Sequence, residues 1–242
     1  MADPARLARS IEAELKRLGS SERAAGEKQY LKSDLTFYGT TLGEMRRLAK
    51  EVSKSAELDH DDVIALSEEL WSKPVFERRM IAVVLLELHA RDLHPPDLRL
   101  IERLIRESKT WALVDGLAGD VVGTMALQHN IRRTLDRWAK DAVFWVRRSS
   151  LLAELKPLKA GAPFEPFAKR ADAMLEETEF FIRKAIGWVL REMSKKRPDE
   201  VYEWIAPRAH RASGVTMREV VRRMEPKRAE RLMSANRARR PA

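Results

Sequence analysis

Four short segments, each beginning with an aromatic ring, repeat along the chain: Phe76-Glu77-Arg78-Arg79-Met80, Trp111-Ala112-Leu113-Val114-Asp115, Trp145-Val146-Arg147-Arg148-Ser149 and Phe181-Ile182-Arg183-Lys184-Ala185. Their rings are 35, 34 and 36 residues apart. Apolar residues recur every three or four positions, which is the period of an α-helix, and alternating strand-like runs are missing. A period of about 35 residues that holds two helices is typical of a solenoid of helical hairpins. Since the tetratricopeptide consensus is absent, the sequence predicts an all-α array of HEAT-like repeats.

The apolar periods and the breakers between them also predict the individual helices. We expect helices over residues 4–18, 21–33, 41–55, 60–71, 75–91, 95–107, 110–127, 130–139, 143–155, 164–174, 178–195, 198–208, 213–224 and 226–236. We assign residues 1–226 to a single repeat domain. Residues 227–242 form a basic C-terminal segment, and we expect its last residues to be frayed.

Composition limits the class of protein. A chain of 242 residues with 44% hydrophobic content can bury a large core, and the absence of cysteine excludes disulfides, thiolate zinc sites and a cysteine nucleophile. The first ten residues lack the apolar core of a signal peptide, and no stretch approaches a membrane span. We therefore expect an intracellular, cytoplasmic protein.

The net charge is +9, but residues 227–242 supply +5 of it and leave only +4 for the rest. The repeated placement of basic residues is more informative. If one helix of each pair lines a concave surface, a basic stripe forms there from Arg46 and Arg47, Arg78 and Arg79, Arg147 and Arg148, Arg183 and Lys184, and Arg222 and Arg223. Such a stripe suits a polyanion such as DNA, although charge runs on helices are also commonly solvated faces.

Two residues break the repeat. Four residues after the ring the segments read Met80, Asp115, Ser149 and Ala185, so an acid occurs in one of the four. Seven residues after the ring they read Val83, Ala118, Leu152 and Trp188. Functional sites often violate the rule that their scaffold obeys, so Asp115 and Trp188 are candidate site residues.

Trp111 and Asp115 are four residues apart and therefore share one side of a helix, and Trp188 comes from the helix two repeats on. Core packing is the alternative for Trp111, because rings lead every repeat. A structural ion pair with an arginine such as Arg148 is the alternative for Asp115, since carboxylates are seldom buried without a partner. Other chemistry finds no support: the five histidines form no ligand pair, and the sequence has no Walker loop, no G-x-G-x-x-G and no G-x-S-x-G.

Two segments can now be compared with a known family: Ser108-Lys109-Thr110-Trp111-Ala112-Leu113-Val114-Asp115, and the more specific Phe180-Phe181-Ile182-Arg183-Lys184-Ala185-Ile186-Gly187-Trp188-Val189-Leu190-Arg191-Glu192. Both resemble the AlkD-like DNA alkylation repair glycosylases. Tyr30-Leu31-Lys32, Phe37-Tyr38-Gly39 and Arg46-Arg47 are also similar, so the resemblance covers nearly the whole chain.

The resemblance implies a right-handed superhelical solenoid with a concave basic face that binds duplex DNA. It implies excision of cationic N3- and N7-alkylated purines such as 3-methyladenine and 7-methylguanine, by a monofunctional glycosylase of base excision repair. The reaction would need neither metal nor cofactor, and the lesion would not be flipped into a pocket, unlike in most glycosylases. We expect the enzyme to act as a monomer, to have no membrane partner and, in a prokaryote, to associate with the nucleoid.

The family's catalytic carboxylate aligns with Asp115, its sugar-contacting tryptophans with Trp111 and Trp188, and its active-site arginine with Arg148. With the basic stripe, the resemblance gives a set of expected DNA contacts: Tyr30, Arg46, Arg47, Arg79, Arg147, Arg183, Lys184 and Arg191. Two departures are seen against one member of the family: Thr110 stands where that member has a second tryptophan, and the loop after Gly39 is one residue longer. The competing hypothesis is a HEAT-like adaptor that binds DNA or protein without catalysis, because a fold does not settle function. A degenerate relative should have lost the acid or the tryptophans, and this chain has kept them.

Overall fold

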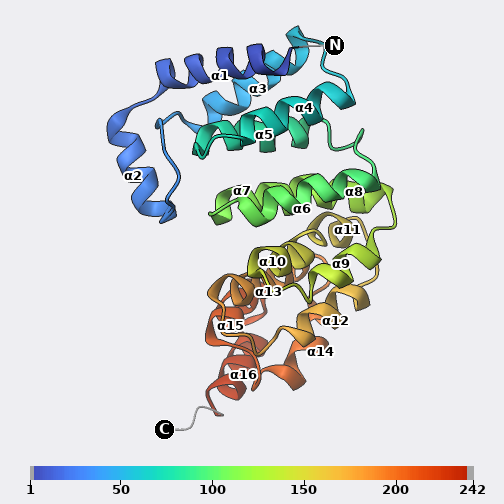
Figure 1. The fold of residues 1–242 in the computed structure, drawn as a ribbon. Helices are drawn as coiled ribbons and strands as arrows, with labels where there is room; N and C mark the ends of the chain where they lie inside the picture. Colours follow the sequence, from blue (N-terminus) through green and yellow to red (C-terminus); the bar gives the residue numbers. More distant parts are fainter. Residues whose placement is uncertain (1–2, 239–242) are drawn as a thin grey trace. The chain divides into compact units, whose positions relative to one another are not determined.

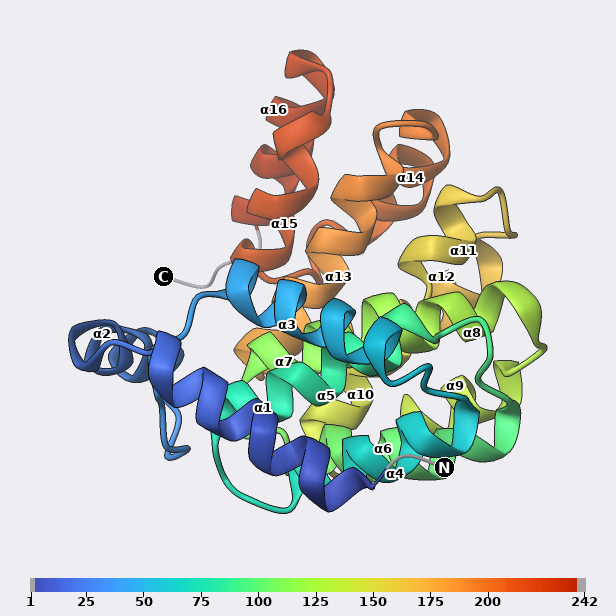
Figure 2. The ribbon, with the colours of Figure 1, turned by 90° about the horizontal axis from the view of Figure 1, so that it is seen from above.

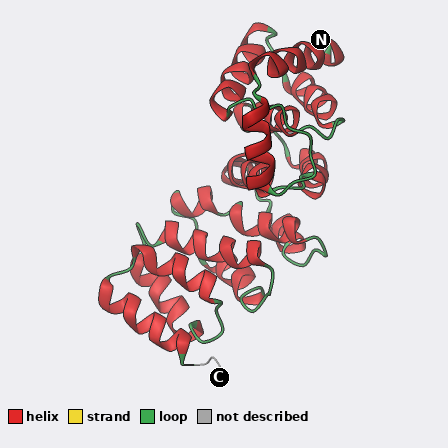
Figure 3. Ribbon diagram, turned by 90° about the vertical axis from the view of Figure 1, so that its left-hand side faces the viewer, coloured by secondary structure: helices red, strands yellow, loops and turns green. Residues whose placement is uncertain are grey.

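The computed structural model describes residues 3–238, and this part of the chain consists of helices joined by turns and short loops (Figures 1 and 3). Within residues 3–238, β pairing is limited to an isolated bridge between Thr36 and Val75. The all-α prediction is therefore confirmed. No helix in this described range is long and apolar enough to cross a membrane.

The chain divides into two compact units, Met1–His129 and Asn130–Ala242. The first unit holds α1 (Pro4–Leu18), α2 (Ser21–Leu31), α3 (Leu42–Ser55), α4 (His60–Trp71), α5 (Phe76–Leu88), a 3-10 turn (Pro95–Asp97), α6 (Leu98–Glu107), α7 (Trp111–Asp115), a π-helix (Gly116–Val122) and α8 (Gly123–Gln128). In it, α5 packs against α3, α4 and the π-helix, and α1 packs against α4. The helix α2 projects from the side of this unit (Figures 1 and 2).

The second unit continues with α9 (Arg132–Trp138), α10 (Phe144–Leu152), α11 (Leu155–Lys159), α12 (Glu165–Ala173), α13 (Phe180–Met193), α14 (Pro198–Ile205), a 3-10 turn (Ala206–Arg208), α15 (Gly214–Val220), a 3-10 turn (Val221–Arg223) and α16 (Pro226–Arg237). Its central helix is α13, which packs against α10, α11 and α15. The C-terminal segment expected from the sequence therefore begins as a helix. The residues expected to fray, 239–242, lie outside the described part of the chain.

Local sequence determines where the helices begin. A capping box starts α3: the Thr41 hydroxyl accepts a hydrogen bond from the Glu44 N–H, and the Glu44 carboxylate accepts one from the Thr41 N–H. Asp3 caps α1 by a single bond, in which its carboxylate accepts from the Arg6 N–H, and Pro4 occupies the first turn, where a missing N–H costs nothing. Each such cap stabilises its helix by about 1 kcal/mol.

Burial then fixes how the helices stack. Every residue of α5 from Phe76 to Leu86 is buried, whereas α6 buries only one face, through Leu98, Ile101, Leu104 and Ile105. A helix that is buried all round lies in the interior, and one with a single apolar stripe covers it. Each fully buried large apolar side chain stabilises the fold by about 1.5–3 kcal/mol.

An ion cluster ties α1 to the helices beneath it. The Glu12 carboxylate of α1 accepts hydrogen bonds from Arg78 Nη1 and Lys73 Nζ, both at 2.7 Å, and from the Tyr38 hydroxyl at 2.9 Å. Burial opposes ionisation of Glu12, but its bonds to Lys73, Lys16 and Tyr38 outweigh burial and lower its pKa to about 2. Arg78 is 1% exposed and also donates to two backbone carbonyl groups, so its role in this structure is to hold α1 and α4 on α5.

Two of the differences between the observed helices and the sequence prediction are larger than a shifted end or a 3-10 turn. The helix expected over 110–127 is α7, a π-helix and α8 in succession, and the short helix α11 was not predicted. Pro157 lies in the first turn of α11, where proline is tolerated because those N–H groups have no partner within the helix. In the π-helix, Gly116 faces α5 so closely that a Cβ there would lie 2.7 Å from Val83 Cγ1.

Candidate functional site

Asp115 is the last residue of α7, and it lies at the surface of the first unit. Leu113 and Val114 are fully buried, whereas Trp111 and Asp115 are half-buried. Their spacing of four residues places the indole and the carboxylate on one side of the helix. Asp115 is therefore not a core residue, and neither is Trp111, unlike Phe76 at the equivalent step, which is 5% exposed and stacked on Phe37.

The π-helix Gly116–Val122 follows Asp115 without a break. Its wider turn is rare in proteins and occurs often at functional sites. Gly116 permits the close approach to α5, while a Cβ on Gly119 would meet nothing within 4 Å. Sequence reasoning missed this element, although two glycines inside an apolar helical run were the available signal.

Tyr30, on the projecting helix α2, meets Trp111. The two rings lie edge to face, with centroids 5.8 Å apart and an interplanar angle of 83°. An ion pair of 2.6 Å between Lys109 Nζ and Asp34 Oδ2 joins the loop after α2 to the residues before α7. Tyr30 is 72% exposed, so its ring is open to a ligand beside Trp111.

The predicted basic contacts of the first unit have different environments. Arg46 pairs with Glu87 and Arg47 with Glu51, and about half of each arginine side chain is exposed. Arg79 is 7% exposed, lies over the Trp71 ring and donates from Nη1 to the Glu107 carbonyl at 2.5 Å. Burial lowers the pKa of Arg79 from its usual high value.

Arg148 occupies in the second unit the environment that Arg79 has in the first. It is 3% exposed, donates from Nη1 to the Phe181 carbonyl at 2.5 Å, and places its guanidinium 5.8 Å from the Phe181 ring centroid. In each unit, the basic residue three positions after the ring binds a backbone carbonyl of another helix. Arg79 binds the last residue of α6, and Arg148 binds the second residue of α13. This contact joins successive repeats and holds the Arg148 charge in a fixed place.

An aromatic cluster surrounds Phe181. The ring centroids of Phe144, Trp145 and Phe180 lie 6.2, 4.8 and 5.3 Å from that of Phe181, and Phe180 is 52% exposed. Sequence reasoning named Trp145 and Phe181 only as repeat-leading rings. The pairs Phe144-Trp145 and Phe180-Phe181 recur at the same step of successive repeats, and that doubling was the signal for the other two rings.

The remaining predicted cations of the second unit each have an acidic or carbonyl partner. Arg147 binds both carboxylate oxygens of Glu177 at 2.8 Å, and Arg183 donates to the Glu177 carbonyl at 2.6 Å. Lys184 and Arg191 both pair with Glu219. On α13 the half-buried Trp188 lies between these two cations, four residues after Lys184 and three before Arg191.

The predicted site residues thus fall into two groups. Tyr30, Trp111 and Asp115 are gathered in the first unit, and Arg148 and Trp188 belong to the second. That both groups meet around one substrate stays a prediction, as do the individual DNA contacts.

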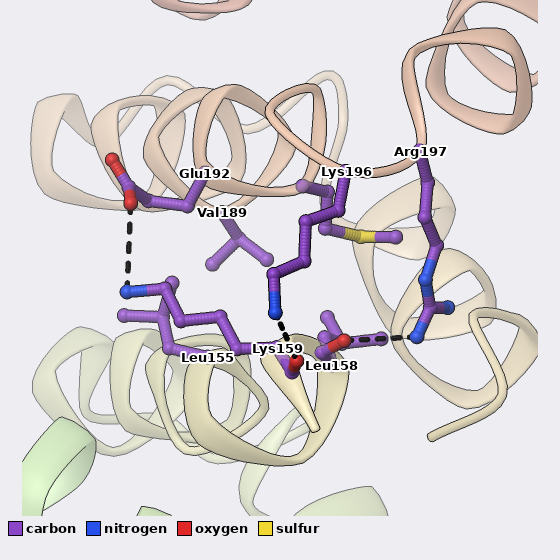
Figure 4. Close-up of a pocket in the computed structure, with 8 residues that line it drawn as sticks. Leu155, Leu158, Lys159, Val189, Glu192, Lys196 and Arg197 are labelled. Carbon is purple, nitrogen blue, oxygen red and sulfur yellow. Dashed lines mark hydrogen bonds and ion pairs between the residues drawn. The ribbon is translucent and has the colours of Figure 1, made fainter. Parts of the chain in front are cut away.

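Two pockets in the described part of the second unit are lined by other residues. A cavity of about 10 Å³ between α11 and α13 has room for about one water molecule. Its rim is closed by Lys196 Nζ and Arg197 Nη2, which donate to the carbonyls of Lys159 and Leu158 (Figure 4). An open cleft of about 420 Å³ between α12 and α14 is lined by Phe164, Glu165, Ala168, Lys169, Asp172, Glu200, Trp204 and Arg208. Neither contains Trp188 or Arg148, and no three His, Asp or Glu side chains within residues 3–238 could together hold a metal ion.

Comparison with known proteins identifies the family. Among solved structures, a predicted DNA alkylation repair enzyme from Enterococcus faecalis is 24% identical, with a TM-score of 0.78 over 86% of this chain and 97% of that one. The proteins smu.31 and AlkD2 from Streptococcus mutans are 19% and 18% identical, each with a TM-score of 0.59 over 76% of this chain and over 93% and 91% of their own. These structures share its fold, and no curated protein matches its sequence. The family model for DNA alkylation repair enzymes matches residues 11–224, so the chain belongs to that family.

Proposed function

We propose that this protein is a monofunctional DNA glycosylase that excises cationic N3- and N7-alkylated purines from duplex DNA. The observation that carries the proposal is the position of Asp115: a half-buried carboxylate at the end of α7, on the same side as Trp111, in a member of the DNA alkylation repair family. An acid at this step breaks the repeat, since the other three segments have Met80, Ser149 and Ala185 there.

The chemistry explains why an acid is useful there. Alkylation at N3 or N7 makes the purine cationic and hence a good leaving group, so the enzyme need not protonate the base. As the glycosidic bond breaks, positive charge develops on the deoxyribose. A fixed anion beside the sugar stabilises this oxocarbenium-like transition state more than the ground state. Opposite unit charges about 4 Å apart at an effective dielectric of about 20 interact by roughly 4 kcal/mol. Asp115 would also orient the attacking water.

The aromatic residues suit the same transition state. An indole face attracts positive charge and packs on the apolar side of a sugar, so Trp111 and Trp188 would flank the deoxyribose. The edge-to-face contact with Tyr30 holds the Trp111 ring, and Tyr30 itself would touch the DNA surface. The exposed Phe180 ring extends the apolar surface around Arg148.

Arg148 would hold a phosphate next to the lesion. Its guanidinium is buried and held by its hydrogen bond to the Phe181 carbonyl. The side chain therefore cannot extend toward DNA, and a phosphate would have to approach it closely. We propose that the lesion is not flipped into a pocket. Selectivity would then come from the leaving group more than from a tight base pocket.

The direct test incubates the purified protein with a duplex that carries one 7-methylguanine and measures free base and abasic sites. We expect stoichiometric release of 7-methylguanine, with no strand cleavage beyond that caused by the abasic site itself. A matched duplex with unmodified guanine should release nothing. Tight binding to both duplexes without release of base would refute the glycosylase and favour the adaptor.

A further inference from the structure

Glu219 on α15 is a buried carboxylate that faces the helix carrying Trp188. It is 2% exposed, and α15 packs extensively against α13. A Cβ on Gly187 of α13 would lie 2.6 Å from Glu219 Cβ and 2.8 Å from the Thr216 carbonyl oxygen. The Thr216 hydroxyl also donates to the Arg183 carbonyl at 3.0 Å. Backbone and side chain of α15 are therefore pressed against α13, and Glu219 has little freedom to move.

The carboxylate of Glu219 binds two cations of α13 and one of the 3-10 turn that follows α15. Lys184 Nζ lies 2.5 Å from Oε1, Arg191 Nη1 contacts Oε2, and Arg222 Nη1 lies 3.4 Å from Oε1. Burial opposes ionisation of Glu219, yet its ion pairs lower its pKa, so the group is charged at neutral pH. The Arg191 side chain is 21% exposed and that of Lys184 38%, against 59% for Arg222, so Arg191 makes the most shielded of the three pairs.

Helical spacing relates these pairs to Trp188. Lys184, Gly187 and Arg191 follow one another on the side of α13 that faces Glu219, at intervals of three and four residues. Trp188 is adjacent to this row, between its two cations. The Glu219 carboxylate, which forms ion pairs with Lys184 and Arg191, thus restrains the turn of α13 that carries the Trp188 indole.

We propose that Glu219 is a positioning residue that holds Lys184 and Arg191 on either side of Trp188 and thereby fixes the orientation of the indole. The same ion pairs keep both cations from DNA phosphates, in contrast to their expected role as DNA contacts. This inference rests on the proposed glycosylase function, because the orientation of Trp188 matters for excision only if the indole contacts the deoxyribose.

The test compares the full-length wild type with Glu219→Gln, which keeps the shape of the side chain and removes its charge. Three quantities are measured: the single-turnover excision rate, the salt dependence of binding to undamaged duplex, and the melting temperature. We expect excision to fall at least tenfold, because the indole loses its fixed orientation. The two released cations should steepen the slope of log K against log salt by up to about 1.8, since each new phosphate contact adds about 0.9.

Thr216→Val is the matched control, because it removes a hydrogen bond across the same helix interface and leaves the ion pairs intact. It should lower the melting temperature without changing the salt slope or the excision rate of the folded protein. A Glu219→Gln protein with the wild-type excision rate and salt slope would overturn the proposal and make Glu219 a packing residue.

Lys184→Met removes the ion pair between Lys184 and Glu219 by changing its partly exposed partner. This variant keeps the proposal testable if Glu219→Gln does not fold. Slower excision at an unchanged salt slope supports it. A slope that flattens by about 0.9 means that Lys184 contacts a phosphate, and overturns it. If the wild type releases no base, the proposed function fails, and the salt slopes still report whether Glu219 holds the two cations.

Discussion

At the scale of single residues, the aromatic rings that begin the four repeated segments differ in how deeply they are buried. Phe76 is buried in the core, whereas Trp111, Trp145 and Phe181 are only half-buried. The pattern of the sequence treats them alike, because a ring is needed at each step for packing. Exposure separates them: the half-buried rings retain a face that a ligand can reach.

Trp188 provides a test at this scale. We expect Trp188→Ala to slow excision of 7-methylguanine by about 30-fold, the equivalent of a desolvated cation–π contact of about 2 kcal/mol. Because Trp188 is half-buried, the melting temperature of the variant should stay close to that of the wild type. Thermal unfolding followed by circular dichroism measures it. Losses of stability and activity that match one another would favour a packing role for the indole.

At the scale of elements, the π-helix that follows Asp115 packs closely against α5, and it can do so because Gly116 has no side chain. Gly116→Ala places a methyl group against Val83 and should destabilise the fold by about 1–3 kcal/mol through overpacking. It should also slow excision, because Asp115 is the preceding residue. Urea unfolding and single-turnover kinetics measure the two effects.

Gly119→Ala is the control within the same π-helix, where an added Cβ has open space. It should leave stability and excision close to wild type. If Gly116→Ala behaves like Gly119→Ala, then the close approach to α5 does not position the acid.

Much of the helical pattern could be predicted from the sequence. Bounds such as Pro4–Leu18 and His60–Trp71 agree with the prediction, because capping residues and apolar periods mark them. The π-helix was missed, because Gly116 and Gly119 inside an apolar run signal a departure from regular α-helix without specifying its type. The short helix α11 was missed because its proline looks like a breaker when its position in the first turn is unknown.

The candidate site was predictable only in part. Asp115 and Trp188 stood out because they break a repeat, which needs no knowledge of contacts. The partners of Lys184, Arg191 and Arg147 could not be foreseen, because Glu219 and Glu177 come from outside the ring-led segments. Charge placement therefore located the cations but did not show which of them bind other parts of the protein.

At the scale of the whole molecule, a net charge of +9 favours a polyanionic partner, and binding to duplex DNA should weaken as salt rises. Arg47 is among the more exposed of the predicted contacts. Arg47→Ala should flatten the slope of log K against log salt by about 0.9 if it contacts a phosphate. Glu51→Ala removes the partner of Arg47 and keeps the cation, so it should not flatten the slope. Equal slopes for Arg47→Ala and wild type would remove Arg47 from the DNA interface.

The central claim is that the Asp115 carboxylate stabilises the positive charge that develops on the sugar. Asp115→Asn keeps the size of the side chain and removes its charge, so the fold and most of the DNA binding should persist. The decisive measurement is the single-turnover rate of 7-methylguanine release from duplex DNA by the wild type and by Asp115→Asn, at enzyme concentrations that saturate the duplex. We predict a loss of about a hundred- to thousandfold for the variant, from part of an interaction of roughly 4 kcal/mol. Release at the wild-type rate would contradict the account.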